Sequence, residues 1–282
     1  MRVCYLLGYP VGHSKSAVMH NAAFRELGLD YRYELKSVPP DELGALVASE
    51  LRGIDFAGGS VTIPHKLAII EHLDGVDPSA LRIGAVNTIV NENGQLKGYN
   101  TDGTGALKGI TEAYGDVEEA RVVMVGAGGA AKAVGYHLST GVRELIIANR
   151  TLERAEELAA SLSANPECRA TVRSIHLERA PLRAAIMEAD ILVNGTPLGM
   201  HPKTDDTPVQ KEMLHPDLLV FDLVYNPIKT RLLREAEEAG AAILPGVNML
   251  VYQGVTAFKM WTGVDPPVET MKAAVVRALG GE

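Results

Sequence analysis

Lys66 is the side chain whose position best suits proton transfer. It follows the segment Ser60–Pro64 and lies in the predicted first turn of a helix that continues to Leu73. Pro64 fits such a first turn, where the missing N–H group costs nothing. Because the N-terminus of a helix carries a positive partial charge, it disfavours a cation and favours a lysine that exchanges a proton. An exposed surface lysine remains the alternative explanation.

Ser14 and Ser16 are candidates for binding a polar ligand. They stand two residues apart on a loop that follows the predicted strand 3–7. Two hydroxyl groups at the end of a strand could bind a polyol or a carboxylate. Ser16 could equally cap the predicted helix 17–27. The residue types leave both explanations open.

Asp102 and Gln253 are two further polar candidates. Asn93-Gly94 predicts a tight hairpin turn, and Asp102 follows the return strand of that hairpin. Its carboxylate either takes part in chemistry or caps a helix from about residue 104. Gln253 is a neutral amide on the mostly apolar predicted helix 246–263. A buried amide needs partners, which a substrate hydroxyl or a neighbouring backbone could supply.

A glycine-rich turn predicts a dinucleotide site. The apolar strand 122–125 is followed by Gly126, Gly128 and Ala131, which fit the spacing G-x-G-x-x-G/A. The helix that starts near Ala130 offers free backbone N–H groups and a positive dipole end to a pyrophosphate. An ordinary tight turn between strand and helix is the alternative, because such turns also favour glycine.

The next predicted strand indicates which dinucleotide is bound. Units that bind NAD usually carry an acidic residue where this strand ends, but here the position holds Asn149. Arg150, Thr151 and Arg154 follow. Guanidinium groups and a hydroxyl bind a 2′-phosphate, which a carboxylate would repel. Positive charge is also unfavourable at a helix start unless an anion is bound there. The sequence therefore predicts NADP rather than NAD.

Length, charge and cysteine content limit the class of protein. The 282 residues suffice for two domains, and a net charge of −8 argues against nucleic acid or an anionic membrane as partner. Cys4 and Cys168 lack metal-ligand spacing, so we expect no metal site and a reducing cytoplasm. We see no signal-peptide pattern and no membrane-spanning segment. The sequence does not fix the oligomeric state, and a homodimer stays open.

Alternation of strands and helices predicts two α/β domains. Residues 1–103 and 246–282 would form a domain with a mixed sheet, and residues 104–245 a Rossmann-like, doubly wound domain. The strands expected in the first are 3–7, 31–37, 55–62, 84–90 and 96–99. Those expected in the second are 122–125, 144–148, 190–194, 218–223 and 242–244. Residues 163–189 show no clear element.

Nine motifs together resemble one family. The chain resembles shikimate dehydrogenases, within the shikimate/quinate dehydrogenase family, over its whole length and in the right order. The segments that carry the resemblance are HSKS, SVTIPHK, GAVNT, NTDG, GAGGAAKA, NRTLERA, NGTPLGM, DLVYNP and MLVYQ. Lys15, Ala17 and Ser60 depart from the residues that are usual in the family at these positions.

The resemblance implies an enzyme that reversibly reduces 3-dehydroshikimate to shikimate with NADP(H). Quinate as a second substrate, use of NAD, or a non-catalytic NADP sensor are the alternatives. Lys66 and Asp102 would be the acid–base pair. Residues implied in substrate binding are these two with Ser14, Ser16, Thr62, Asn87, Tyr225 and Gln253. Residues implied in cofactor binding are Gly126, Ala127, Gly128, Gly129, Ala130, Asn149, Arg150, Thr151, Arg154, Thr196, Met200, Val224, Gly246 and Met249.

Overall fold

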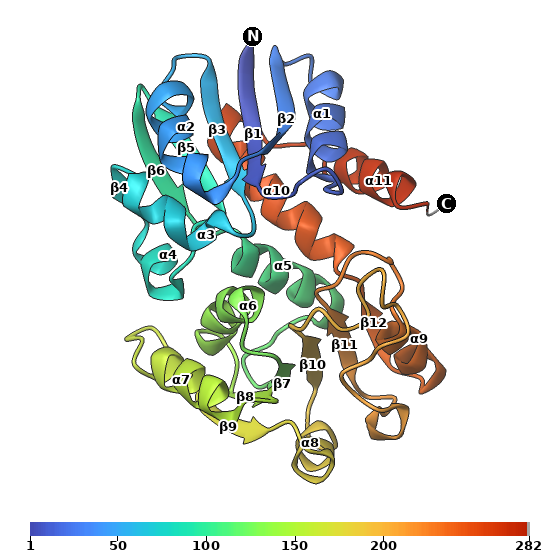
Figure 1. The fold of residues 1–282 in the computed structure, drawn as a ribbon. Helices are drawn as coiled ribbons and strands as arrows, with labels where there is room; N and C mark the ends of the chain where they lie inside the picture. Colours follow the sequence, from blue (N-terminus) through green and yellow to red (C-terminus); the bar gives the residue numbers. More distant parts are fainter. Residues whose placement is uncertain (281–282) are drawn as a thin grey trace. The chain divides into compact units, whose positions relative to one another are not determined.

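The computed structural model describes residues 1–280, and its contacts divide the chain into two units (Figure 1). The first unit comprises Met1–Asp102 and the segment from Val251 onward, and the second comprises Gly103–Leu250. The sequence placed these boundaries at 103 and 246. The difference at the second boundary has a packing cause, because a Cβ at Gly246 would lie 2.6 Å from the carbonyl oxygens of Leu223 and Val224. Residues 246–250 therefore pack with the second unit.

The first unit contains the predicted mixed sheet. Its strand order is β2-β1-β3-β5-β6-β4, in which β5 runs antiparallel to both β3 and β6. Asn93 and Gly94 both adopt positive φ, which confirms the tight turn between β5 and β6. The strands are β1 (Arg2–Gly8), β2 (Tyr31–Ser37), β3 (Phe56–Val61), β4 (Gly75–Val76), β5 (Thr88–Glu92) and β6 (Gln95–Tyr99).

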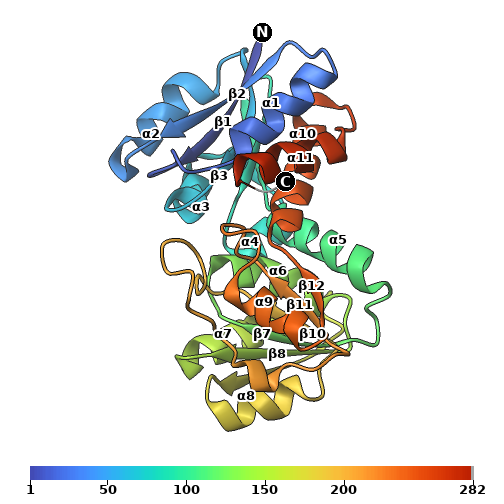
Figure 2. The same ribbon diagram turned by 90° about the vertical axis from the view of Figure 1, so that its right-hand side faces the viewer.

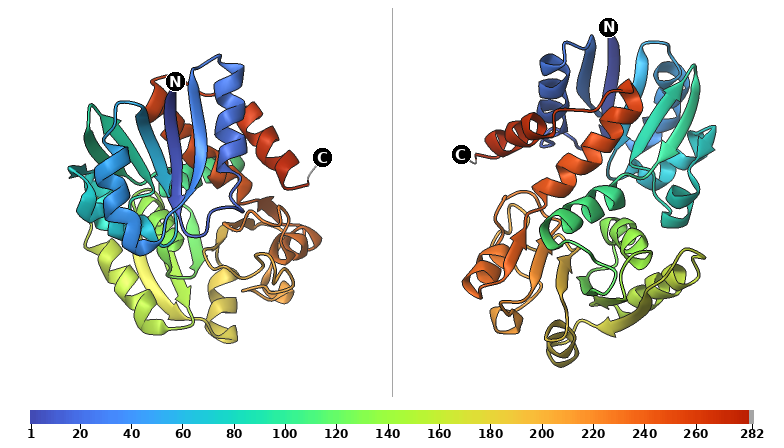
Figure 3. Two further views of the ribbon diagram at one scale, coloured as in Figure 1. Left: turned by 45° about the horizontal axis from the view of Figure 1, so that its top comes forward. Right: turned by 180° about the vertical axis from the view of Figure 1, so that it is seen from behind.

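Helices cover both faces of this sheet. In Figure 2, α2 and α3 lie on one face, while α1, α10 and α11 lie on the other; Figure 3 shows the latter face from behind. The helices are α1 (Ser16–Glu26), α2 (Leu43–Leu46), α3 (His65–Ala68), α4 (Pro78–Ile83), α10 (Val247–Thr262) and α11 (Val268–Ala278). A π-helical turn (Val47–Leu51) continues α2, and a 3₁₀ turn (Ile69–His72) continues α3.

The helix that carries Lys66 is shorter than the sequence suggested. We expected one helix from Pro64 to Leu73, but α3 ends at Ala68 and Pro64 occupies the position before its first residue. Leu73 is already extended, and its N–H bonds to the carbonyl of Ile70. Lys66 nevertheless lies in the first turn, as predicted.

The second unit has the predicted doubly wound fold. Its strand order is β12-β11-β10-β7-β8-β9, and all pairs are parallel. The strands are β7 (Arg121–Val125), β8 (Glu144–Asn149), β9 (Thr171–His176), β10 (Ile191–Asn194), β11 (Leu219–Asp222) and β12 (Ala242–Leu244). The helices are α5 (Asp102–Tyr114), α6 (Gly129–Ser139), α7 (Leu152–Ser163), α8 (Arg179–Ile186) and α9 (Arg231–Glu238). None of the helices within residues 1–280 is long and apolar enough to cross a bilayer.

Two elements of the second unit, β9 and α8, were not predicted from the sequence. β9 and α8 fall within residues 163–189, for which we expected no element. β9 lies at the edge of the sheet and none of its residues is fully buried, so it lacks the apolar run that marks the other strands. α8 is only eight residues long and contains Pro181, which weakens a helical pattern.

An aromatic cluster fills the space between α1, β2 and α10. His20 is fully buried there, with its ring stacked on Tyr33 at a centroid distance of 4.5 Å. Phe258 and Trp261 also pack against it. Neither ring nitrogen has a hydrogen-bond partner among the residues that the structure describes. Burial lowers the pKa of His20 to about 3, so its ring is neutral at pH 7.

We expect His20 to make the protein acid-sensitive. Below the ordinary histidine pKa of about 6.5, the unfolded chain binds a proton that the folded chain does not, so stability falls as pH falls, by up to about 1.4 kcal/mol per pH unit. His20→Phe keeps an aromatic ring and removes this slope between pH 6.5 and 3. Urea unfolding at several pH values measures it. The exposed His13→Gln serves as the control. Equal slopes in wild type and His20→Phe would contradict the prediction.

Candidate active site

Lys66, Asp102 and Asn87 form one hydrogen-bonded group in the first unit. Lys66 Nζ donates to Asp102 Oδ2 at 2.5 Å, and Asn87 Nδ2 donates to Asp102 Oδ1 at 2.8 Å. The side chain of Asp102 is 12% exposed and that of Lys66 is 27% exposed. Both carboxylate oxygens are therefore held by the protein, while the lysine still reaches solvent.

Neighbouring polar residues orient this group. Asn87 Oδ1 accepts the backbone N–H of Thr101 at 2.8 Å, and Asn100 Oδ1 accepts that of Asp102 at 3.1 Å. The carbonyl of Lys66 accepts the N–H of Val86 at 2.8 Å, which ties α3 to the segment before β5. Asn100 and Thr101, whose contacts orient Asn87 and Asp102, were not among the predicted site residues, although both stand in the NTDG segment. Asp102 is the first residue of α5 and its carboxylate pairs with Lys66, so the capping alternative is wrong.

The two serines form a pair, but Ser16 is not a helix cap. Ser14 Oγ donates to Ser16 Oγ at 3.1 Å and accepts the backbone N–H of Ser16 at 3.2 Å. Lys15 holds the N-cap position of α1, and Ser16 is the first helical residue. The capping alternative for Ser16 is therefore wrong, and its hydroxyl stays beside that of Ser14.

The loops after β1 and β3 are packed closely together. A Cβ built at Gly8 would lie 2.4 Å from Thr62 Cγ2, so only glycine fits at the end of β1. The N–H of Tyr9 donates to the carbonyl of Ile63 at 3.0 Å. Since Ser14 lies on the first loop and Thr62 on the second, these two hydroxyl groups belong to adjacent strand ends.

Gln253 lies on α10 and is buried. The next residue, Gly254, marks the place where α10 packs on α1, since a Cβ there would lie 2.3 Å from Met19 Cε and 3.4 Å from His20 Cε1. Gln253 is thus anchored beside the helix that begins with Ser16. Tyr225, the other residue expected at the substrate, belongs to the second unit.

The turn between β7 and α6 has the shape of a phosphate cradle. Gly126 has a φ of +108°, and a Cβ there would meet Gly195 and Thr196 at about 3.0 Å. A Cβ built at Gly128 or at Gly129 would have no neighbouring atom within 4 Å. No side chain caps α6, so the N–H groups of its first turn are free for an anion. Ala127 and Ala130 complete this turn.

The end of β8 carries cationic side chains without acidic partners. Arg150 and Arg154 are exposed, and within residues 1–280 neither takes part in an ion pair. Asn149 Nδ2 donates to the carbonyl of Thr151 at 2.8 Å, and the Thr151 side chain makes no capping bond to α7. These residues fit an anion such as a 2′-phosphate.

Two further loops carry the remaining cofactor candidates. Thr196 and Met200 follow β10, and Val224 follows β11. The N–H of His201 donates to the carbonyl of Asn226 at 3.0 Å, which joins the two loops. The tight packing of Gly246 on Leu223 and Val224 brings the start of α10, and with it Met249, to the second loop.

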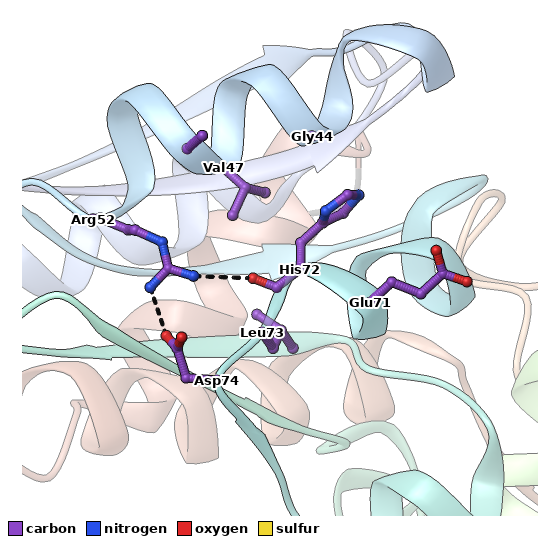
Figure 4. A pocket seen from close by; sticks show the side chains of 8 residues that line it. Gly44, Val47, Arg52, Glu71, His72, Leu73 and Asp74 are labelled. Atoms are coloured by element: carbon purple, nitrogen blue, oxygen red, sulfur yellow. Dashed lines mark hydrogen bonds and ion pairs between the residues drawn. The ribbon is translucent and has the colours of Figure 1, made fainter.

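A separate cavity of about 310 Å³ lies elsewhere in the first unit (Figure 4). The Arg52 guanidinium there donates to Asp74 Oδ2 at 2.6 Å and to the carbonyls of Gly94 and His72, so three of its five N–H donors are used by the protein itself. The cavity includes none of the predicted site residues. It is lined by Gly44, Val47, Ala48, Arg52, Glu71, His72, Leu73 and Asp74.

Family models match most of the chain. The model of the shikimate dehydrogenase substrate binding domain matches residues 6–89, and that of shikimate / quinate 5-dehydrogenase matches residues 109–224. The shikimate 5′-dehydrogenase C-terminal domain matches residues 246–276. The shikimate dehydrogenase (NADP(+)) of Methanopyrus kandleri is 49% identical, over 97% of this chain and 94% of that protein. The chain belongs to the shikimate dehydrogenase family.

Solved structures of the family share the fold. Shikimate 5-dehydrogenase of Thermus thermophilus, in complex with NADP(H) and shikimate, is 38% identical with a TM-score of 0.87, covering 99% of this chain and all of that one. Quinate dehydrogenase of Corynebacterium glutamicum, in complex with NAD, is 33% identical with a TM-score of 0.88, covering 98% of this chain and 99% of that one. The resemblance and the fold class expected from sequence are confirmed.

Proposed function

We propose that the protein is an NADP-dependent shikimate dehydrogenase that reversibly reduces 3-dehydroshikimate to shikimate. The observation that carries this proposal is the Lys66–Asp102 pair, held by Asn87, in a chain of this family. An acid–base pair of this kind suits interconversion of a ketone and an alcohol. The named relative with 49% identity supports the same substrate and cofactor.

The mechanism assigns proton transfer to Lys66. When bound, the nicotinamide supplies the hydride that reduces the ring ketone. The Lys66 ammonium hydrogen-bonds the ketone oxygen, stabilises the negative charge that develops there and gives it a proton. In the reverse direction the neutral amine takes the proton of the hydroxyl. Asp102 holds Lys66 in place through the bond at 2.5 Å, and it orients the substrate hydroxyl.

Substrate binding in this proposal uses hydroxyl and amide groups. Ser14 and Ser16 bind the carboxylate, because they are paired at the start of α1 and leave hydrogen-bonding capacity for an anion. The ring hydroxyls of the substrate are bound by residues of the first unit, namely Thr62, Asn87, Asp102 and Gln253.

Cofactor binding in this proposal uses the second unit. The free N–H groups of α6 and the turn at Gly126–Ala130 bind the pyrophosphate. The adenosine ribose and its 2′-phosphate are bound by Asn149, Arg150, Thr151 and Arg154. Residues that contact the nicotinamide half are Thr196, Met200, Val224, Gly246 and Met249.

Quinate and NAD define the second candidate function. We consider this second function because the chain is also similar to a quinate dehydrogenase whose structure was solved in complex with NAD. Two observations favour shikimate and NADP: the Ser14–Ser16 pair, and the exposed Arg150 and Arg154, which form no ion pair within residues 1–280.

The net charge of −8 supports a small-molecule enzyme without nucleic-acid partners, and two free cysteines support a cytoplasmic location. Light scattering would decide between monomer and homodimer.

A turnover assay with two substrates and two cofactors tests the function. Purified protein receives shikimate or quinate, each with NADP or NAD, and absorbance follows nicotinamide reduction. We expect fast turnover with shikimate and NADP only. Comparable rates with quinate or NAD would move the protein to the second candidate function. Absence of turnover in every combination, with NADPH still bound, would identify a cofactor-binding protein without this activity.

Lys66→Met tests the proton-transfer role. The variant keeps an apolar stem and loses the ammonium group, so kcat should fall by about 10²–10⁴-fold, the usual contribution of general acid–base catalysis. Affinity for NADPH, measured by fluorescence titration, should change less than about twofold, because Lys66 lies in the other unit. Lys97→Met, on the exposed side of β6, is the matched control. Near-normal turnover in Lys66→Met would refute the assignment.

Arg150→Ala tests the 2′-phosphate site. Removing one charged hydrogen bond should raise the KM for NADP about tenfold or more, while the KM for NAD, which lacks this phosphate, changes little. Arg179→Ala, an exposed arginine at the start of α8, controls for surface charge. If both cofactors lose affinity equally in Arg150→Ala, the arginine does not recognise the phosphate.

A further inference from the structure

Asp222 is a buried carboxyl group that the proposed chemistry does not use. It ends β11 and is 0% exposed. Burial raises its pKa to about 6, although hydrogen bonds from Thr230, Val224 and Asn194 oppose the rise. A buried carboxylate is tolerated only where donors surround it.

Three donors from three segments converge on this carboxylate. Oδ1 accepts Asn194 Nδ2 at 2.9 Å and the backbone N–H of Val224 at 3.0 Å. Oδ2 accepts the hydroxyl of Thr230 at 2.6 Å. Asn194 ends β10, Val224 lies on the loop after β11, and Thr230 is the N-cap residue of α9. Asp222 thus joins two strand ends and a helix start.

The bonds continue from Asn194 into the loop after β10. Asn194 Oδ1 accepts both the backbone N–H of Thr196 at 3.0 Å and its hydroxyl at 2.7 Å. Asn194 Nδ2 also donates to the carbonyl of Leu198 at 3.3 Å. The position of Thr196 is therefore fixed by Asn194, which is itself fixed by Asp222.

Both loops lie where a doubly wound sheet binds its ligand. They leave the carboxyl ends of β10 and β11, and β10 neighbours β7, at which the strand order reverses. Thr196 lies on the first loop and Val224 on the second, and the proposed function gives both a place against the cofactor.

We propose that Asp222 is a positioning residue for NADP(H), which holds the loops after β10 and β11 in their binding geometry without touching the cofactor. This inference rests on the proposed function. An ionised carboxylate suits the task because all three partners donate, whereas an amide at this position turns an N–H₂ group toward donors.

Asp222→Asn in the full-length protein tests the inference. The dissociation constant for NADPH, measured by nicotinamide fluorescence, should rise about tenfold or more, since bonds to a charged acceptor are lost. The KM for shikimate should stay within about twofold. Asp190→Asn is the matched control. Asp190 Oδ2 also accepts a backbone N–H, that of Arg121 at 2.7 Å, but it precedes β10 at the opposite edge of the sheet.

The outcomes distinguish a role of Asp222 in positioning the cofactor loops from a contribution to the stability of the fold alone. Weaker NADPH binding in Asp222→Asn, with normal binding in Asp190→Asn, supports the inference. A lower melting temperature with unchanged NADPH affinity in Asp222→Asn overturns it, as does an equal loss of affinity in both variants. If Asp222→Asn does not fold, Asn194→Ala decides, because it cuts the link to Thr196 and leaves Asp222 bonded to Val224 and Thr230. Unchanged NADPH affinity in Asn194→Ala overturns the inference.

The test does not depend on turnover. A wild-type protein that binds NADPH but does not oxidise shikimate would refute the proposed function, and the comparison of NADPH affinities among variants would still stand.

Discussion

The carboxylate of Asp102 is almost out of water, and side chains from two other segments of the first unit hold both of its oxygens. A buried charge is costly unless partners surround it. Lys66 supplies the countercharge from the loop after β3, and Asn87 supplies a neutral donor from the segment before β5. These residues are distant in sequence, so the antiparallel placement of β5 between β3 and β6 is what brings them together.

The second unit also contains a buried carboxylate, but with a different set of partners. Asp222 is also buried, yet within residues 1–280 its partners include no cation; neutral donors from two strand ends and a helix start surround it. At Asp102 an ammonium group that still reaches solvent lies beside the carboxylate, which suits proton transfer. At Asp222 the partners are neutral donors on strand ends and a helix start, which suits fixing the backbone. The two buried carboxylates thus differ in their partners, because one is paired with a cation and the other with neutral donors.

Much of the fold could be predicted from local pattern. The alternation in Tyr31–Ser37 gave β2 with its observed bounds, and the apolar runs gave the central strands of the second unit. β9 could not be found in this way, since an edge strand with polar side chains has no apolar run. Of the candidate site, the glycine turn between β7 and α6 was predictable because its residues are contiguous. The pairing of Asp102 was implied only by the resemblance to a family and not by local pattern, because its partner is a lysine 36 residues earlier in the chain. Asn194 and Asp222 stood at strand ends, but a pairing between strands leaves no local signal.

The close packing at Gly8 sets the spacing between two hydroxyl-bearing loops by van der Waals contact. Contacts of this kind are insensitive to pH and ionic strength, in contrast to the Lys66–Asp102 ion pair. The spacing of the two loops is therefore independent of the electrostatics of the Lys66–Asp102 pair. Conditions that weaken this ion pair thus leave the distance between the loops that carry Ser14 and Thr62 unchanged.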